Sequence, residues 1–194
     1  MTKNKKSPHT PLLRKTFIIL VGLGIGVGHH LRENKKNFSH TIEESMIQCY
    51  FSPKGGCTQA IIDAIDQAEQ EVHIYIFSFT LESITKALER AQARNVKVYI
   101  ITDKTQAKGR ESQIPKLGTW LDDLFIDKQK GVAHHKFIVI DRKFVILGSF
   151  NYSNSAEKYN REAIVYINDE RTARAFYEEW IKQKAQKRVC LYNS

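Results

Sequence analysis

Residues 72 to 102, VHIYIFSFTLESITKALERAQARNVKVYIIT, decide the fold class. The stretch begins and ends with a continuous apolar run, Val72 to Phe79 and Val96 to Thr102. Between these runs, apolar residues recur every three to four positions and Asn95 follows them, which is typical of a helix with one buried face. That face carries Leu81, Ile84, Leu88 and Ala91. Strand, helix and strand with near-continuous apolar strands predict an α/β fold, with a mixed, largely parallel central sheet and helices on both faces.

The pattern continues on both sides of this stretch. Upstream, a helix from Thr58 has a buried face of Ile61, Ala64, Ile65 and Ala68. Downstream, a hairpin pairs Lys136 to Ile140 with Phe144 to Leu147, and a further strand spans Glu162 to Ile167. A last helix begins near Asp169, a suitable N-cap. Its packed face is Ala173, Phe176, Tyr177, Trp180 and Ile181. Between residues 103 and 133 we expect only one short helix, around 117 to 124.

The formal net charge of +9 is concentrated at the N-terminus. Residues 1 to 36 hold eight Lys or Arg and one Glu, so the rest of the chain has a net charge of only +2. A basic stretch followed by the uncharged run of residues 17 to 28 resembles a secretory signal, and it is shorter than the ~20 apolar residues that span a bilayer. We therefore expect an exported protein, periplasmic or secreted, or one anchored to the membrane by an uncleaved segment.

The domain boundaries follow from these shifts in composition. We expect a signal peptide or membrane anchor in residues 1 to 28, a polar linker in 29 to 45, one globular catalytic domain in 46 to 188 and a C-terminal tail in 189 to 194. Three cysteines, Cys49, Cys57 and Cys190, lie beyond the signal, and export would permit a disulfide. No cysteine or histidine spacing predicts a metal site, so we expect no metal and no cofactor.

Residues 134 to 151, HHKFIVIDRKFVILGSFN, carry the chemistry. Six positions fit the pattern His-x-Lys-x4-Asp-x6-Gly-Ser-x-Asn, namely His134, Lys136, Asp141, Gly148, Ser149 and Asn151. Side chains alternate faces along a strand, so His134 and Lys136 project to one side and His135 to the opposite, packed face. A cation that binds phosphate oxygens beside an imidazole that attacks phosphorus suits a phosphodiester substrate.

The remaining motif residues have supporting roles. Ser149 and Asn151 follow the glycine that ends the next strand, and they offer neutral donors to the same phosphate oxygens. Strand parity turns Asp141 away from His134, which favours a structural role for this carboxylate. A nucleophilic histidine needs a partner on its other nitrogen, and Glu162, at the start of the following strand, is the candidate.

The segment resembles the HKD signature of the phospholipase D superfamily, and in particular its small bacterial endonuclease-like (Nuc-type) branch. The similarity covers roughly residues 46 to 182. It includes Tyr50-Phe51-Ser52-Pro53, Gly55-Gly56-Cys57, Phe77-Ser78-Phe79-Thr80 and Asn160-x-Glu162. Mitochondrial relatives of the Zucchini type share the single signature and an N-terminal membrane segment.

The resemblance implies a metal-independent, two-step reaction. One histidine attacks phosphorus to form a phosphohistidine, and a second histidine protonates the leaving alcohol and then activates water. This chain has one signature and no internal repeat, so the second histidine must come from another subunit. A homodimer with a shared active site, in which His134 faces its symmetry mate, is the direct consequence.

The substrate remains open between two classes, because nucleic acids and phospholipids both present a singly charged phosphodiester. Basic residues in and near the variable loop favour an exported endonuclease acting on DNA or RNA: Lys104, Lys108, Arg110, Lys116, Lys128 and Lys130. The possible membrane anchor favours a phospholipase D acting on headgroups such as those of phosphatidylcholine or cardiolipin. Trp120 and Leu121 as an apolar loop tip would support it, but we favour the interpretation that they are ordinary core under that loop. A catalytically silent nucleic-acid-binding module is disfavoured, because every residue of the motif is present.

Overall fold

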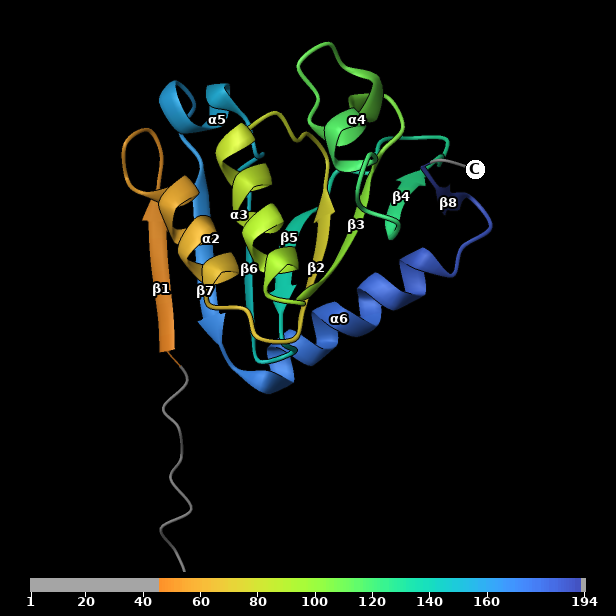
Figure 1. The fold of residues 1–194 in the computed structure, drawn as a ribbon. Coiled ribbons are helices and arrows are strands. Elements are labelled where there is room, and N and C mark those ends of the chain that lie inside the picture. The colour runs from red at the N-terminus through yellow and green to blue at the C-terminus, as the bar shows by residue number, and fades with distance from the viewer. Residues whose placement is uncertain (1–45, 193–194) are drawn as a thin grey trace, which may run out of the picture. The chain divides into compact units, whose positions relative to one another are not determined.

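A computed structural model describes residues 46 to 192, which form one eight-stranded sheet with helices around it (Figure 1). The strands are β1 (Met46–Phe51), β2 (Glu71–Ile76), β3 (Lys97–Asp103), β4 (Leu124–Asp127), β5 (Lys136–Ile140), β6 (Phe144–Gly148), β7 (Ala163–Asn168) and β8 (Val189–Leu191). The helices are α2 (Cys57–Asp66), α3 (Glu82–Ala93), the short 3₁₀ helix η1 (Gln106–Lys108), α4 (Ile114–Leu117), α5 (Asn154–Lys158) and α6 (Glu170–Lys184).

The strand order is β1-β7-β6-β5-β2-β3-β4-β8. The predicted α/β class with a mixed sheet is confirmed, but the expectation of a largely parallel sheet is wrong. Only β2 with β3 and β3 with β4 pair in parallel, whereas every other neighbouring pair is antiparallel. The strand-helix-strand unit of residues 72 to 102 does not extend to the rest of the sheet. The three-residue connection between β5 and β6 permits only antiparallel pairing.

Helices cover both faces of the sheet, as predicted. On one face α2 and α3 pack their apolar stripes on the central strands, and Ile61, Ile65, Ile84 and Leu88 are fully buried there. On the other face α6 lies across the strands (Figure 1), and its Trp180 is fully buried. The indole Nε1 of Trp180 donates a hydrogen bond of 2.8 Å to the backbone oxygen of Ile74. These two packed layers hold β2 and β5 rigidly at the centre of the sheet.

The predicted N-cap of the last helix is confirmed, because the Asp169 carboxylate accepts a hydrogen bond from the backbone N–H of Thr172. Three strands were not foreseen, namely β1, β4 and β8. The short helix expected around 117 to 124 instead spans Ile114–Leu117, and Leu124 already begins β4. Residues 189 to 191, which we placed in a tail, form β8 and pair with β4.

The expected signal or anchor (residues 1 to 28) and the polar linker (29 to 45) lie outside the described residues. Within residues 46 to 192, no helix is long and apolar enough to cross a membrane. Cys49, Cys57 and Cys190 are all free thiols. Burial, and after it the nearby carboxylate of Glu157, raises the pKa of the Cys57 thiol to about 11.

Candidate active site

The site residues gather along the side of the sheet that is formed by strand ends, where four neighbouring or nearby strands end or begin. β2 ends at Ile76, and the antiparallel β5 begins beside it at Lys136. β6 ends at Gly148, opposite the beginning of β7. Figure 1 shows this edge at the top of the molecule, with α4 and α5 above the sheet. We refer to it as the catalytic edge.

His134 and Lys136 meet around one aromatic ring. The His134 imidazole lies with its centroid 4.7 Å from that of Phe77, and the Nζ atom of Lys136 is 5.2 Å from the same centroid. Lys136 Nζ also donates a hydrogen bond of 3.0 Å to the backbone oxygen of His134. The structure thus brings together an imidazole and an ammonium on the surface of Phe77.

Two opposing effects act on the Lys136 ammonium. Burial lowers the pKa of Lys136 below the ordinary lysine value, and the nearby Glu162 carboxylate partly offsets this by favouring the charged form. Glu162 immediately precedes β7, which is two positions from β5 in the sheet. Within residues 46 to 192 Lys136 forms no ion pair, so its ammonium is available to an anionic substrate.

Ser149 and Glu162 are directly bonded to each other. The Ser149 hydroxyl donates a hydrogen bond of 2.5 Å to Glu162 Oε2, and Asn160 Nδ2 donates one of 3.0 Å to Glu162 Oε1. Behind them, the Ser52 hydroxyl accepts from the backbone N–H of Glu162 at 3.1 Å and donates to the backbone oxygen of Asn160 at 3.0 Å. Each oxygen of the carboxylate thus has a donor from its own chain and retains a second lone pair for another.

Gly148 allows this close approach of β6 and β7. A Cβ atom at position 148 would lie 2.0 Å from the backbone oxygen of Ala163, so no larger residue fits. Asn151 follows on the same segment, and its Oδ1 atom is buried without a hydrogen-bond partner among the described residues. Buried polar atoms without partners are rare in native proteins and point to a functional group. The motif thus ends in an amide that still needs a donor.

The neighbouring histidine has a different environment. The His135 ring lies 4.5 Å from the centroid of Tyr75 and 5.7 Å from that of Phe137. Both of these aromatic residues belong to the core beneath α6. Burial lowers the pKa of His135, which favours the neutral ring. The two adjacent histidines therefore contact different rings, but both precede β5 and both are exposed, so His135 is not on the packed face that strand parity predicted.

Asp141 lies at the opposite end of β5 from His134. Its carboxylate accepts hydrogen bonds from three consecutive backbone N–H groups, those of Glu69, Gln70 and Glu71, at 2.8 to 2.9 Å. These bonds tie the hairpin turn to the start of β2. The structure does not bring Asp141 to the catalytic edge, and its contacts are those of a structural residue.

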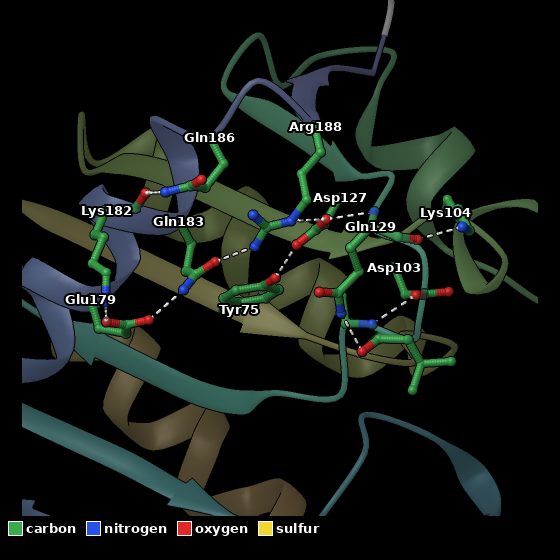
Figure 2. A network of polar contacts seen from close by, with 12 residues as sticks. Tyr75, Asp103, Lys104, Asp127, Gln129, Glu179, Lys182, Gln183, Gln186 and Arg188 are labelled. Atoms are coloured by element: carbon green, nitrogen blue, oxygen red, sulfur yellow. Dashed lines mark hydrogen bonds and ion pairs between the residues drawn. The ribbon is translucent and has the colours of Figure 1, made fainter.

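A buried polar network holds the loop that leads into His134 (Figure 2), and the sequence reasoning missed it. Asp127 is fully buried and accepts from the hydroxyl of Tyr75 at 2.5 Å, the backbone N–H of Gln129 at 2.9 Å and Arg188 Nε at 3.0 Å. Burial, and after it the bond to Asp127, raises the pKa of Tyr75. The loop after β4 is thereby fixed at its start.

Asp103 fixes the other end of the same loop. It is fully buried and accepts from the backbone N–H groups of Thr105 at 2.8 Å and Ala133 at 2.9 Å. Burial alone would raise the pKa of Asp103, but these hydrogen bonds, together with one from the Thr105 hydroxyl, outweigh it and lower the pKa. Asp103 and Asp127 are each the last residue of a parallel strand. A carboxylate at that position in the sequence was the signal that could have pointed to this network.

An imidazole beside an ammonium, with neutral polar groups nearby at the strand ends of a mixed sheet, suits a phosphodiester substrate. The family model described as "Cardiolipin synthase, PLD-like domain" matches residues 61–184. The chain belongs to the phospholipase D superfamily.

Curated relatives and solved structures agree with this membership. A protein named phospholipase D from Rickettsia conorii is 38% identical over 144 residues, which cover 74% of this chain and 72% of the relative. The mitochondrial cardiolipin hydrolase of Canis lupus familiaris is 31% identical over 62% of this chain and 47% of its own length. The phospholipase D family member Nuc from Salmonella typhimurium has a TM-score of 0.70 at 32% identity, covering 78% of this chain and all of that one. The predicted family is therefore confirmed.

Proposed function

We propose that this chain is a metal-independent endonuclease that cleaves DNA or RNA through a phosphohistidine intermediate. In the first step, an imidazole nitrogen of His134 forms a bond to phosphorus while the bond from phosphorus to the leaving oxygen breaks. The Lys136 ammonium and the amide N–H groups of Asn151 hold the non-bridging oxygens as charge develops on them. The Ser149 hydroxyl has one proton, which it gives to Glu162 in the free enzyme, so it joins them only by turning that proton to the phosphate. The His134–Phe77–Lys136 arrangement carries this proposal, because it places a nucleophile beside a cation.

The leaving oxygen needs a proton, and a second imidazole supplies it. In the proposed twofold dimer this imidazole is that of His134 in a second copy of the chain. In the second step the same imidazole takes a proton from water, whose oxygen attacks phosphorus and breaks the bond to His134. The product is a phosphomonoester, and both histidines return to their starting forms. Each oxygen of Glu162 can accept a further hydrogen bond. In the proposed mechanism Glu162 accepts one from the N–H of the His134 imidazole and thereby orients the ring.

Exposed apolar groups around the catalytic edge support the dimer. Phe51 is 61% exposed, Val132 55% and Tyr159 78%. Phe51 pairs with Ala163, next to Glu162, whereas Val132 lies two residues before His134. Large apolar side chains grouped around a site that contains half of the required histidines favour a second copy as their cover.

The charges along the catalytic edge favour nucleic acid as substrate. Four basic residues in loops at this edge and one at the end of α5 are exposed, and within residues 46 to 192 none of them forms an ion pair: Lys54, Arg110, Lys130, Arg161 and Lys158. The cations of the β5–β6 turn, at the opposite edge, are paired with glutamates of the β2 region. An unpaired basic rim attracts a polyanion.

A phospholipase D activity is the second candidate, and one observation favours it. Curated relatives from three Rickettsia species, 37–38% identical over 74–77% of this chain, are named phospholipase D. The same nucleophile and donors would then act on a lipid phosphodiester. We also propose that residues 1 to 28 direct export or membrane anchoring, which would bring either activity to the cell envelope or beyond.

Parallel assays in EDTA test the two candidates. The full chain is incubated with supercoiled plasmid, single-stranded DNA and RNA, and separately with phosphatidylcholine or cardiolipin vesicles. We expect cleavage of nucleic acid, and His134→Ala should reduce it by at least about 10³-fold. His135→Ala is the matched control and should retain activity. Lipid hydrolysis without nuclease activity would reverse the ranking, and full activity of His134→Ala would refute the mechanism.

Subunit mixing tests the shared site. An excess of His134→Ala chains, allowed to exchange with wild-type chains, should reduce activity far below the value expected from dilution alone. An equal excess of His135→Ala chains should not. Activity of a chain that sedimentation shows to be monomeric at assay concentrations would contradict the dimer.

A further inference from the structure

A pocket of about 590 Å³ opens beside the catalytic edge, at the carboxyl ends of β3 and β4. Crevices outside the carboxyl ends of parallel strands are a common place for ligands in α/β folds, and this volume is within the usual range for small-ligand sites. The proposed reaction at His134 makes no use of it. We call it the β3–β4 pocket.

Three lysines, Lys104, Lys108 and Lys128, line this pocket, and no carboxylate does. In the part of the chain that the structure describes, none of the three forms an ion pair. The buried carboxylates of Asp103 and Asp127 lie close in sequence, but backbone amides and Arg188 already occupy them. Arg188 offsets the charge of Asp127, whereas Asp103 keeps its charge, so three lysines stand against one uncompensated carboxylate. The pocket therefore keeps a positive balance and is suited to an anion.

One of the lysines is held in place. Lys104 Nζ donates a hydrogen bond of 2.5 Å to the backbone oxygen of Gln129, a contact drawn in Figure 2. An ammonium has three N–H donors, so two remain for a ligand. Fixing the side chain in advance reduces the conformational entropy that binding would otherwise cost.

The rest of the pocket wall is apolar and includes an aromatic ring. Ala107, Ile126 and Leu191 line it together with Tyr192. The ring of Tyr192 rests against Gly118, where an added Cβ would lie 2.6 Å from a ring carbon. Because β8 runs antiparallel to β4 and the backbone N–H of Tyr192 bonds the backbone oxygen of Leu124, this ring closes the side of the pocket at the beginning of β4, across from the lysines that follow β3 and β4. A cation cluster beside an aromatic wall fits a phosphate attached to a planar base.

The β3–β4 pocket and the catalytic residues lie along one edge of the sheet. Neighbouring strands are ~4.8 Å apart, so the three steps from β5 through β2 and β3 to β4 span roughly 14 Å. The loop of residues 128 to 133 connects them directly, because it begins at Lys128 and leads into His134. A polynucleotide chain running along this edge can place one phosphate at His134 and a neighbouring nucleotide in the pocket.

We propose that the β3–β4 pocket binds one nucleotide of a single-stranded nucleic acid substrate. Lys104, Lys108 and Lys128 contact its phosphate, and the base stacks on Tyr192. A base within a duplex is stacked and paired, so only a single strand can present it to the ring. This proposal rests on the proposed nuclease function and deepens it, since it predicts preference for single-stranded substrates.

Binding to the full chain carrying His134→Ala tests the pocket without cleavage. The probe is a fluorescein-labelled single-stranded octathymidylate, followed by anisotropy at several salt concentrations. Lys108→Gln with Lys128→Gln should raise Kd about ten-fold and reduce the salt slope of log Kd by up to ~0.7, the value for one lost phosphate contact on a single strand. Tyr192→Leu should raise Kd about five-fold and leave the slope as it is, because stacking carries no counterion release.

Lys97→Gln is the matched control, since Lys97 is an exposed lysine at the other end of β3. It should leave Kd and the salt slope at their starting values. Equal Kd and salt slope for the pocket variants and this control would overturn the proposal. It would also be overturned if the pocket variants bound cardiolipin-containing vesicles more weakly while their binding to the oligonucleotide stayed unchanged. Thermal melting of each variant identifies any that fail to fold, and the Tyr192 and lysine variants test the pocket independently.

The same variants in the wild-type His134 background separate the two proposals. If the oligonucleotide binds through the pocket but is not cleaved in EDTA, the nuclease function fails and the pocket stands. If it is cleaved with the same KM by the pocket variants and by Lys97→Gln, the pocket fails and the nuclease function stands.

Discussion

Replacement of Asp141 separates the structural part of the motif from its chemistry. In Asp141→Ala, three backbone N–H groups at the start of β2 lose their carboxylate acceptor. Hydrogen bonds to a charged group contribute ~1.5–3 kcal/mol each when shielded, and an exposed amide recovers part of this from water. Two of the three bonds are exposed, so we expect a loss of about 2–4 kcal/mol in the free energy of unfolding.

Asp141→Asn should cost less than Asp141→Ala. The backbone at position 141 has a φ of 52°, which asparagine tolerates better than alanine, and the amide keeps one acceptor oxygen. Urea denaturation followed by tryptophan fluorescence measures the stabilities, with Asp122→Ala as an exposed control. Hydrolysis of bis(p-nitrophenyl) phosphate measures the activity of the folded fraction, which both variants should retain. A stable Asp141→Ala protein that has lost activity would refute a purely structural role.

Three further predictions test the site and the core. Gly148→Ala places a Cβ 2.0 Å from the backbone oxygen of Ala163, so β7 must shift. We expect the free energy of unfolding, measured by denaturation, to fall by ~1–3 kcal/mol. We also expect kcat, measured by steady-state kinetics, to fall about 10²-fold. The lowered pKa of Lys136 places the alkaline limb of the pH–activity profile below the ordinary lysine pKa of ~10.4. Glu162→Gln removes the negative charge that raises this pKa, so the limb should move to lower pH. A limb that stays in place or moves to higher pH would contradict the assignment. Trp180→Phe removes the hydrogen bond to the backbone oxygen of Ile74 and part of a fully buried ring, and it should cost about 1–3 kcal/mol, visible as a lower urea midpoint with kcat unchanged.

The sequence predicted most strongly those features whose signals are local. The apolar runs of β2 and β3, the helical spacing between them and the hairpin of the motif all appear where periodicity places them. Strand parity also distinguished the ring contacts of His134 from those of His135, although both side chains are exposed. These successes share one cause, because alternation along a strand is determined by its own residues.

The features that the sequence did not reveal depend on pairing between distant segments. β4 is four residues long and β8 three, too short for a periodic signal, and each is recognisable only by its partner. The direction of β1 is likewise fixed by pairing with β7, more than 100 residues away. The bonds of Ser52 behind Glu162, and the network of Asp103 and Asp127, arise from the same long-range arrangement.

The turn between β5 and β6 has a consequence for insertions and deletions. Asp141 and Arg142 both have positive φ, and the backbone N–H of Lys143 closes the turn on Ile140, so the hairpin register is set at the end remote from the active site. A one-residue slip of β5 would exchange the faces of its side chains. His135 would then take the face of His134. A protein with an unchanged motif sequence would present an imidazole at the catalytic edge without Lys136 beside it. An insertion or deletion in this turn would therefore inactivate the enzyme without changing any residue of the motif that contacts the substrate.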